Sequence, residues 1–87
     1  MANEWREGID RFIVNGRIDT YPAKPADRRE LLEWVAANAM QPGEVLTEPE
    51  LNDRLVAFRD DAATLRRYLG DEGLLQRTPS GSSYSRA

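Results

Sequence analysis

The chain has 87 residues, which is room for one domain, and its 12 basic and 15 acidic side chains give a net charge of −3. It contains no cysteine and no histidine, which excludes disulfides and the usual zinc ligands and removes the commonest base near neutral pH. We therefore expect no enzyme activity, no metal and no cofactor. No apolar run approaches the roughly 18 residues that span a membrane, and the first residues lack the apolar core of a signal peptide. The expected location is the cytoplasm, with no membrane partner.

The charge is unevenly distributed along the chain. Residues 1–63 carry eight basic and thirteen acidic side chains, a net of −5, whereas residues 64–87 carry four arginines and two acids, a net of +2. Because nucleic acid attracts positive charge, only the last part of the chain is a candidate for binding it.

The N-terminal stretch has the pattern of an amphipathic helix. Asn3 is a favourable N-cap, Gly16 is a favourable terminator, and the apolar residues between them follow helical spacing. These residues are Trp5, Ile9, Phe12 and Ile13. We expect residues 1–16 to form an accessory helix that buries this face near Trp34 or against a second copy of the chain.

A short strand and a long helix are predicted next. Residues 17–21 alternate polar and apolar side chains before Pro22, as a short edge strand does. The clearest helix lies within residues 24–43, with Asp27 at its cap or in its first turn. Its apolar stripe consists of Leu31, Leu32, Val35, Ala36 and Ala39. Trp34 lies beside the stripe, where it either covers the core or stands exposed as an anchor for a partner.

A brief extended piece at Val45–Leu46 precedes the following helix. Thr47 and Glu50 have the spacing of a capping box, in which each side chain bonds the other residue's backbone N–H. The expected apolar face of this helix is Leu51, Leu55 and Phe58.

The last helix spans residues 61–71, with Asp60 or Asp61 as its cap. Its inward residues are Ala62, Leu65 and Leu69. Residues 74–86 then read as two strands joined by a polar turn, which is the pattern of a β-hairpin.

The order of these elements predicts a winged helix. From Arg17 onward, helices and short strands alternate and end in a hairpin, and a short linker joins the last two helices, as a helix-turn-helix requires. The expected fold is α+β, a winged helix-turn-helix with an additional N-terminal helix and a C-terminal β-hairpin wing. The chain would be one domain, with residues 1–16 as accessory helix and 17–87 as core.

The candidate site follows from this fold. The second helix of a helix-turn-helix enters the major groove, where arginine can contact guanine through two hydrogen bonds. Residues of the 61–71 helix would face the groove, and arginines of the wing would touch phosphate. The predicted DNA contacts are Thr64, Arg66, Arg67, Arg77 and Arg86.

Two observations leave another reading open. The same arginines are equally compatible with a solvated face on which they pair with Asp60, Asp61, Asp71 or Glu72. Asp60 and Asp61 also sit where this helix would first meet DNA, and the preceding helix carries Glu48, Glu50 and Asp53. Carboxylates there repel phosphate unless they read cytosine amino groups, and as helix caps they need no other explanation.

Nearly the whole chain, from about Phe12 to Arg86, resembles a bacterial domain family of unknown function. The resemblance rests on three groups of residues, of which the last is the most specific. The first group is Gly16, Arg17, Ile18, Pro22 and Lys24, and the second is Thr47, Glu48, Glu50 and Asn52. The third is Asp61, Leu65, Arg66, Arg67, Leu69, Asp71, Gly73, Leu74, Leu75, Arg77, Gly81, Tyr84 and Arg86. The chain departs from the family pattern at Leu46, Leu51 and Gly70.

The resemblance implies a winged-helix fold and a link to transcription. Such domains occur alone or behind a DNA-binding helix-turn-helix domain in proteins thought to regulate transcription. We therefore expect a transcription-associated domain that contacts double-stranded DNA through the 61–71 helix and the 74–86 wing. The alternative is a protein-interaction or dimerisation module that has the winged-helix shape and does not bind DNA.

Overall fold

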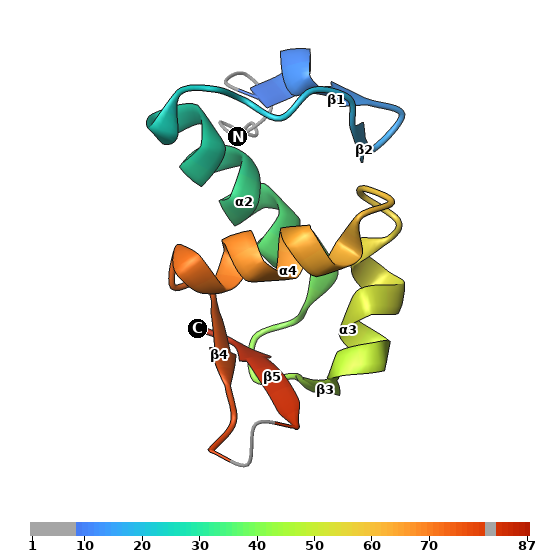
Figure 1. Cartoon of the computed structure of the whole chain (residues 1–87), viewed down its shortest axis with the longest axis vertical. Helices are drawn as coiled ribbons and strands as arrows, with labels where there is room; N and C mark the ends of the chain where they lie inside the picture. Colours follow the sequence, from blue (N-terminus) through green and yellow to red (C-terminus); the bar gives the residue numbers. More distant parts are fainter. Residues whose placement is uncertain (1–8, 80–81) are drawn as a thin grey trace.

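The computed structural model describes residues 9–79 and 82–87. This part of the chain is mixed α+β, with three α-helices and two small antiparallel sheets (Figure 1). The helices are α2 (Pro25–Ala39), α3 (Glu48–Leu55) and α4 (Ala62–Asp71). The strands are β1 (Ile13–Val14), β2 (Arg17–Ile18), β3 (Val45–Thr47), β4 (Leu75–Arg77) and β5 (Ser83–Arg86), and a 3-10 turn, η1, spans Asp10–Phe12.

The predicted N-terminal helix is wrong over its last residues. Ile13–Val14 pairs with Arg17–Ile18 as an antiparallel hairpin, and the two turn residues between them have positive φ angles, 54° at Asn15 and 78° at Gly16. Asn-Gly is the strongest sequence signal for this two-residue turn because both of its central residues need positive φ. Gly16 therefore belongs to a hairpin turn and does not terminate a helix. Asn3 and Trp5 lie outside the described residues.

Helix α2 begins at Pro25, whose missing N–H costs nothing in the first turn of a helix. Asp27 lies in that first turn, one of the two predicted positions, and its carboxylate accepts a hydrogen bond of 3.1 Å from Arg11. The predicted apolar stripe is buried as a whole. Trp34, beside the stripe, is half-buried and meets Phe58 edge-on, with ring centroids 5.3 Å apart. Trp34 thus covers the core.

The predicted capping box at the start of α3 is confirmed. The Thr47 hydroxyl accepts from the Glu50 N–H, and the Glu50 carboxylate accepts from the Thr47 N–H. Leu51 and Leu55 are buried, but Phe58 lies beyond the helix, in the turn that leads to α4.

Strands β3, β4 and β5 form one sheet in the order β3-β5-β4. Leu46 pairs with Tyr84, and Leu75 pairs with Arg86. The predicted hairpin over residues 74–86 is therefore present, with strands at Leu75–Arg77 and Ser83–Arg86, and its second strand lies between its first strand and β3.

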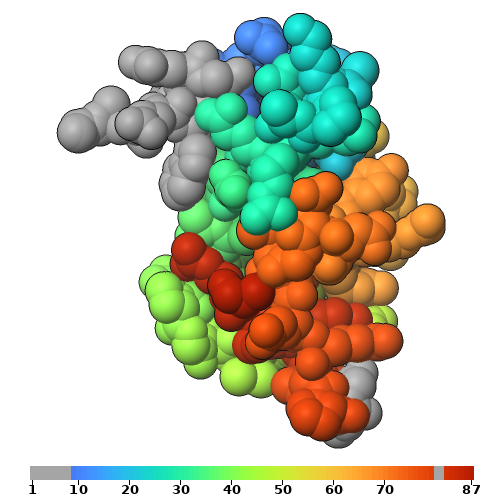
Figure 2. Space-filling model, turned by 90° about the vertical axis from the view of Figure 1, so that its left-hand side faces the viewer, coloured from blue at the N-terminus to red at the C-terminus, as the bar shows by residue number. Residues whose placement is uncertain are grey.

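The core is formed where the three helices meet the sheet. Leu31, Val35, Leu51, Leu55 and Leu69 are all fully buried, and Leu46, Leu75 and Tyr84 close the core from the sheet. Ile9 and Ile18 extend it towards the N-terminal hairpin. Helix α4 crosses in front of α2, between the N-terminal strands above and β4–β5 below (Figure 1). In the side view of Figure 2 its orange atoms extend from the centre to the right-hand margin, above the β4–β5 hairpin.

Arg17 ties the N-terminal hairpin to the turn between α3 and α4. Its guanidinium donates to the carbonyls of Val56 (2.8 Å) and Ala57 (3.2 Å) and reaches the Asp60 carboxylate at 2.5 Å. The Ile18 N–H donates to the Phe58 carbonyl at 2.8 Å. Carbonyls at the end of a helix have no partner within the helix, so these bonds fix the turn that sets the direction of α4.

Candidate nucleic-acid interface

Helix α4 buries one face and leaves another open. Ala62, Leu65 and Leu69 are buried, as the helical spacing predicted. The most exposed stripe contains Ala63, Arg67 and Gly70. A side-chain carbon added at Gly70 would meet nothing within 4 Å, so this stripe has little bulk apart from Arg67.

Arg67 is the predicted contact that the structure leaves free. It is exposed, and its guanidinium forms no hydrogen bond or ion pair with the described residues. It projects from the middle of α4, where a bound partner would meet it before any other long side chain of the stripe.

Arg66, next to it, is engaged inside the domain. Its side chain is only 19% exposed, donates to the Asn52 side-chain oxygen and lies 3.8 Å from the Glu48 carboxylate. Its guanidinium carbon also lies 5.9 Å from the centre of the Tyr84 ring. Arg66 therefore joins α3, α4 and β5. Asn52, which sequence reasoning did not single out as its partner, accepts the hydrogen bond.

Thr64 stabilises the N-terminus of α4. Its hydroxyl donates to Asp61 Oδ2 at 2.7 Å, and its N–H donates to Asp61 Oδ1 at 3.2 Å. The Thr64 hydroxyl, followed by the backbone N–H, holds the pKa of the Asp61 carboxyl below its usual value. Asp61 is therefore the N-cap, one of the two residues predicted for that role.

Arg77 and Arg86 of the β4–β5 hairpin also differ in whether they are exposed or engaged inside the domain. Arg86 donates to the Met40 carbonyl at 3.2 Å and is half-buried, so it links β5 to the end of α2. Arg77 is exposed, with its guanidinium carbon 5.6 Å from the centre of the Tyr84 ring. Of the five predicted contacts, Arg67 and Arg77 are the exposed ones, and Thr64, Arg66 and Arg86 hold the fold.

The carboxylates around α4 are also largely engaged. Asp60 pairs with Arg17, Asp61 caps the helix, and Glu72 pairs with Arg29 at 3.2 Å. Asp71 is exposed at the C-terminal end of the helix. The arginines paired with Asp60 and Glu72 neutralise part of this negative charge, which reduces the repulsion that a polyanion would meet at this surface.

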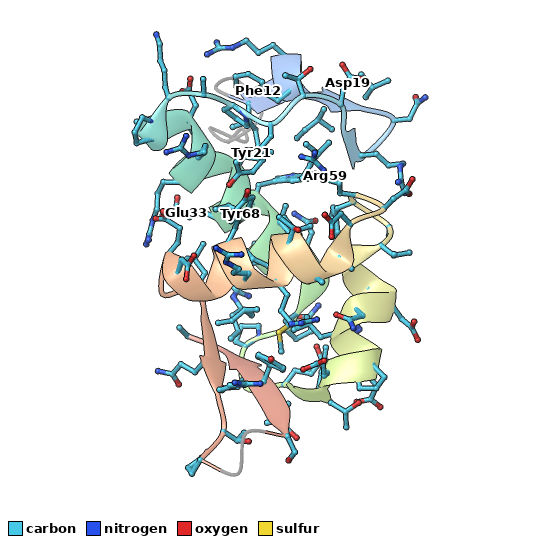
Figure 3. The ribbon with its side chains drawn as sticks, viewed as in Figure 1. Phe12, Asp19, Tyr21, Glu33, Arg59 and Tyr68 are labelled. Carbon is cyan, nitrogen blue, oxygen red and sulfur yellow. The ribbon has the colours of Figure 1, made fainter. Side chains whose placement is uncertain are left out.

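A second group of side chains, not expected from the sequence, lies along one margin of α4. Tyr21 and Tyr68 stack with ring centroids 5.0 Å apart, and the Arg59 guanidinium lies 5.8 Å from the centre of the Tyr21 ring. Figure 3 shows Tyr21, Tyr68 and Arg59 together above α4, on the side away from the hairpin. Residues 21, 59 and 68 form no local sequence pattern. Their proximity becomes visible only because the segment between β2 and α2 packs against α4.

One family model, described as "Uncharacterized protein conserved in bacteria (DUF2087)", matches residues 17–86. The chain belongs to this family. No curated protein and no solved structure matches the chain.

The part that matches DUF2087 contains every element from β2 to β5. It begins at Arg17, which holds the α3–α4 turn, and ends at Arg86, which links β5 to α2. Within residues 9–79 and 82–87, no helix is long and apolar enough to cross a membrane. The same residues contain no cluster of acidic side chains able to hold a metal ion.

Proposed function

We propose that the chain is a winged-helix domain that binds duplex DNA in connection with transcription. Helix α4 would enter the major groove as the second helix of the α3–α4 pair, and β4–β5 would be the wing. The order of α2, β3, α3, α4, β4 and β5 supports this arrangement, as does the position of β5 between β3 and β4. Residues 56–61 connect α3 to α4 and are fixed by Arg17, although this connection is longer than the turn of about three or four residues that is usual in a helix-turn-helix.

The open stripe of α4 is the observation that carries the proposal. Ala63 and Gly70 allow a partner to approach the helix backbone closely, and the guanidinium of Arg67 between them has no hydrogen bond or ion pair with the described residues. Arginine is the side chain that most often reads guanine in the major groove. A free arginine between two small residues therefore suits a helix that lies in a groove.

The proposed roles of the arginines differ from residue to residue. Arg67 would contact base edges, and Arg77 on β4 would contact backbone phosphate. Arg66 would position α4 through Asn52 and Glu48 and would not touch DNA. Because so few side chains make contact, we expect the isolated domain to bind weakly.

Titration of the labelled full chain with random-sequence duplex DNA at low salt tests the proposal. We expect backbone amide signals to move in residues 61–71 and in β4 and β5. Arg67→Gln should weaken binding by about 1–3 kcal/mol. Arg11→Gln is the matched control, because it removes the same charge from η1, at the other end of the molecule (Figure 1). Unmoved signals in α4 and the hairpin, or equal affinity of the two variants, would contradict the proposal.

A protein-interaction module of the same shape is the second candidate. It is favoured by the internal use of Thr64, Arg66 and Arg86, which leaves few free cations on the surface of an acidic chain. If DNA moves no signal, sedimentation of the full chain over a range of concentrations would show whether it self-associates. Of the apolar face predicted for self-association, Ile9, Phe12 and Ile13 pack against the chain's own core, and Trp5 lies outside the described residues.

A further inference from the structure

The stacked pair Tyr21–Tyr68 separates two hollows on the margin of α4 away from the hairpin. The smaller hollow, about 90 Å³, is lined by Arg59, Thr64 and Leu65 besides the two tyrosines. The larger, about 340 Å³, is lined by the two tyrosines together with Arg28, Leu32, Asp71 and Glu72. The same two rings therefore have a guanidinium on either side.

Several hydrogen-bond donors around the Tyr21–Tyr68 pair have no acceptor among the described residues. Within the described residues, the Arg59 guanidinium forms no hydrogen bond, and Arg28 donates once, to the Ala23 carbonyl at 2.8 Å. The Tyr21 and Tyr68 hydroxyls also form no hydrogen bond there. Each hollow is thus lined by both tyrosines and by one guanidinium, Arg59 in the smaller and Arg28 in the larger. Such donors suit a ligand that only accepts hydrogen bonds and carries negative charge.

Both guanidiniums lie near enough to act on Tyr21. Burial, then Tyr68 and then Glu72 raise the pKa of the Tyr21 hydroxyl, whereas Arg28 and Arg59 oppose the rise. An anion beside this hydroxyl would thus be attracted by the two guanidiniums and repelled by the Glu72 carboxylate.

The positions of the carboxylates favour binding of an anion on the Arg59 side of the Tyr21–Tyr68 pair. Glu72 lines the larger hollow and already pairs with Arg29, but exposed Asp71 beside it has no such partner among residues 9–79 and 82–87. Neither acid lines the smaller hollow. Next to Arg59 and Thr64 an anion would meet the Asp61 carboxylate, which Thr64 already binds. Next to Arg28 it would meet both Asp71 and Glu72.

We propose that Arg59, supported by Arg28 and the Tyr21–Tyr68 pair, forms a phosphate-binding site, and that the phosphate belongs to the DNA backbone beside α4. This rests on the proposed DNA binding. A helix in the major groove has a phosphate strand on each side. Arg59 lies on one margin of α4 and the hairpin with Arg77 lies on the other (Figures 1 and 3). The two margins would thus contact the two walls of the groove.

The salt dependence of DNA binding tests this site. Each phosphate contact adds about −0.9 to the slope of log affinity against log salt. Phosphate contacts at this site and at Arg77 would give a slope of about −2, and a phosphate contact at Arg77 alone about −1, since Arg67 contacts bases. We expect Arg59→Gln to make the slope shallower by about 0.9 and Arg11→Gln to leave it unchanged. Tyr21→Phe, which keeps the ring stack and removes the hydroxyl, should weaken binding less than Arg59→Gln does.

The outcomes separate this site from the proposed function. If the chain binds DNA and Arg59→Gln has the same slope as Arg11→Gln, the phosphate site is wrong and the proposed function stands. If the chain binds no DNA, titration with inorganic phosphate decides. Movement of the Tyr21 and Tyr68 ring signals in the native chain, absent in Arg59→Gln, would support a site for free phosphate. No movement would overturn the site together with the proposed function.

Discussion

Arg66 and Arg67 are neighbours in the sequence and have opposite roles in the structure. Successive residues of a helix point about 100° apart, which turns Arg66 towards Asn52 and Glu48 and Arg67 towards solvent. Removing Arg66 would leave Asn52 without its charged donor, whereas removing Arg67 breaks no bond within the described residues.

This contrast predicts different effects on stability. Arg66→Gln should lower the free energy of unfolding by about 1–2 kcal/mol, the range for a partly exposed hydrogen bond to a charged group. Arg67→Gln should change it by less than about 0.5 kcal/mol, as for most surface substitutions. Urea unfolding of the two variants measures both values. Equal losses would mean that Arg66 is not held by α3.

The sequence predicted the inward leucines of α4 but could not separate these two arginines. Leu65 and Leu69 follow from helical spacing alone. The environment of Arg66 depends on how closely α3 and β5 approach α4, and no local pattern states that distance. For the same reason the pairing of Tyr21 with Tyr68 became visible only in the structure.

At the scale of single elements, the start of α4 has a pH-dependent cap. Thr64 holds the pKa of Asp61 below its usual value, mainly through its hydroxyl. A lowered pKa in the folded state means that the cap contributes fully above the usual pKa of about 3.9. That contribution is lost as the pH falls towards the folded-state value.

Asp61→Asn should therefore lose less stability than the native chain between about pH 5 and pH 2, because asparagine still caps a helix and does not titrate in this range. Thr64→Ala should fall between the two, since it removes the hydroxyl donor and keeps the backbone N–H. Thermal unfolding followed by circular dichroism over this pH range provides the measurement. A native chain and an Asp61→Asn variant with parallel profiles would rule out the cap as a source of acid sensitivity.

Two glycines should respond to alanine in opposite directions. Gly16 has a φ of +78°, a conformation that costs an L-residue about 1 kcal/mol or more. Gly70 lies within α4 without a positive φ, and its added carbon would meet open space. Gly16→Ala should therefore destabilise by about 1 kcal/mol, and Gly70→Ala should stabilise by about 0.5–1 kcal/mol.

Chemical denaturation of both glycine variants gives the sign of each change in stability, and a stabilising Gly16→Ala would argue against the β1–β2 turn.

The β1–β2 turn is also where the sequence interpretation failed. Ile9, Phe12 and Ile13 have helical spacing, but β-branched residues next to Asn-Gly favour a hairpin more strongly. The apolar pattern was correct about burial, since Ile9 is fully buried, and wrong about the element that buries it.

Across the whole molecule, the order of elements from Arg17 to Arg86 follows from the sequence, because each has its own cap, turn or apolar period. The contacts that join them do not. Arg17 reaches Val56 and Asp60, about forty positions along the chain, and Arg86 reaches Met40. Such long-range bonds depend on tertiary packing, which a single sequence does not display.

Leu69 is the residue at which the whole arrangement can be tested. It is fully buried in the cluster formed by α2, α3, α4 and the sheet, together with Leu31, Val35 and Leu55. Leu69→Ala removes core volume that the surrounding helices cannot fully refill, so it should lower the free energy of unfolding by about 2–5 kcal/mol. Ala63→Gly, on the opposite face of the same helix, is the comparison, with an expected loss of about 1 kcal/mol or less from helix propensity alone. A loss under about 0.5 kcal/mol for Leu69→Ala would mean that α4 presents its other face to the core. The outward position of Arg67, on which the proposed DNA contact depends, would then be wrong as well.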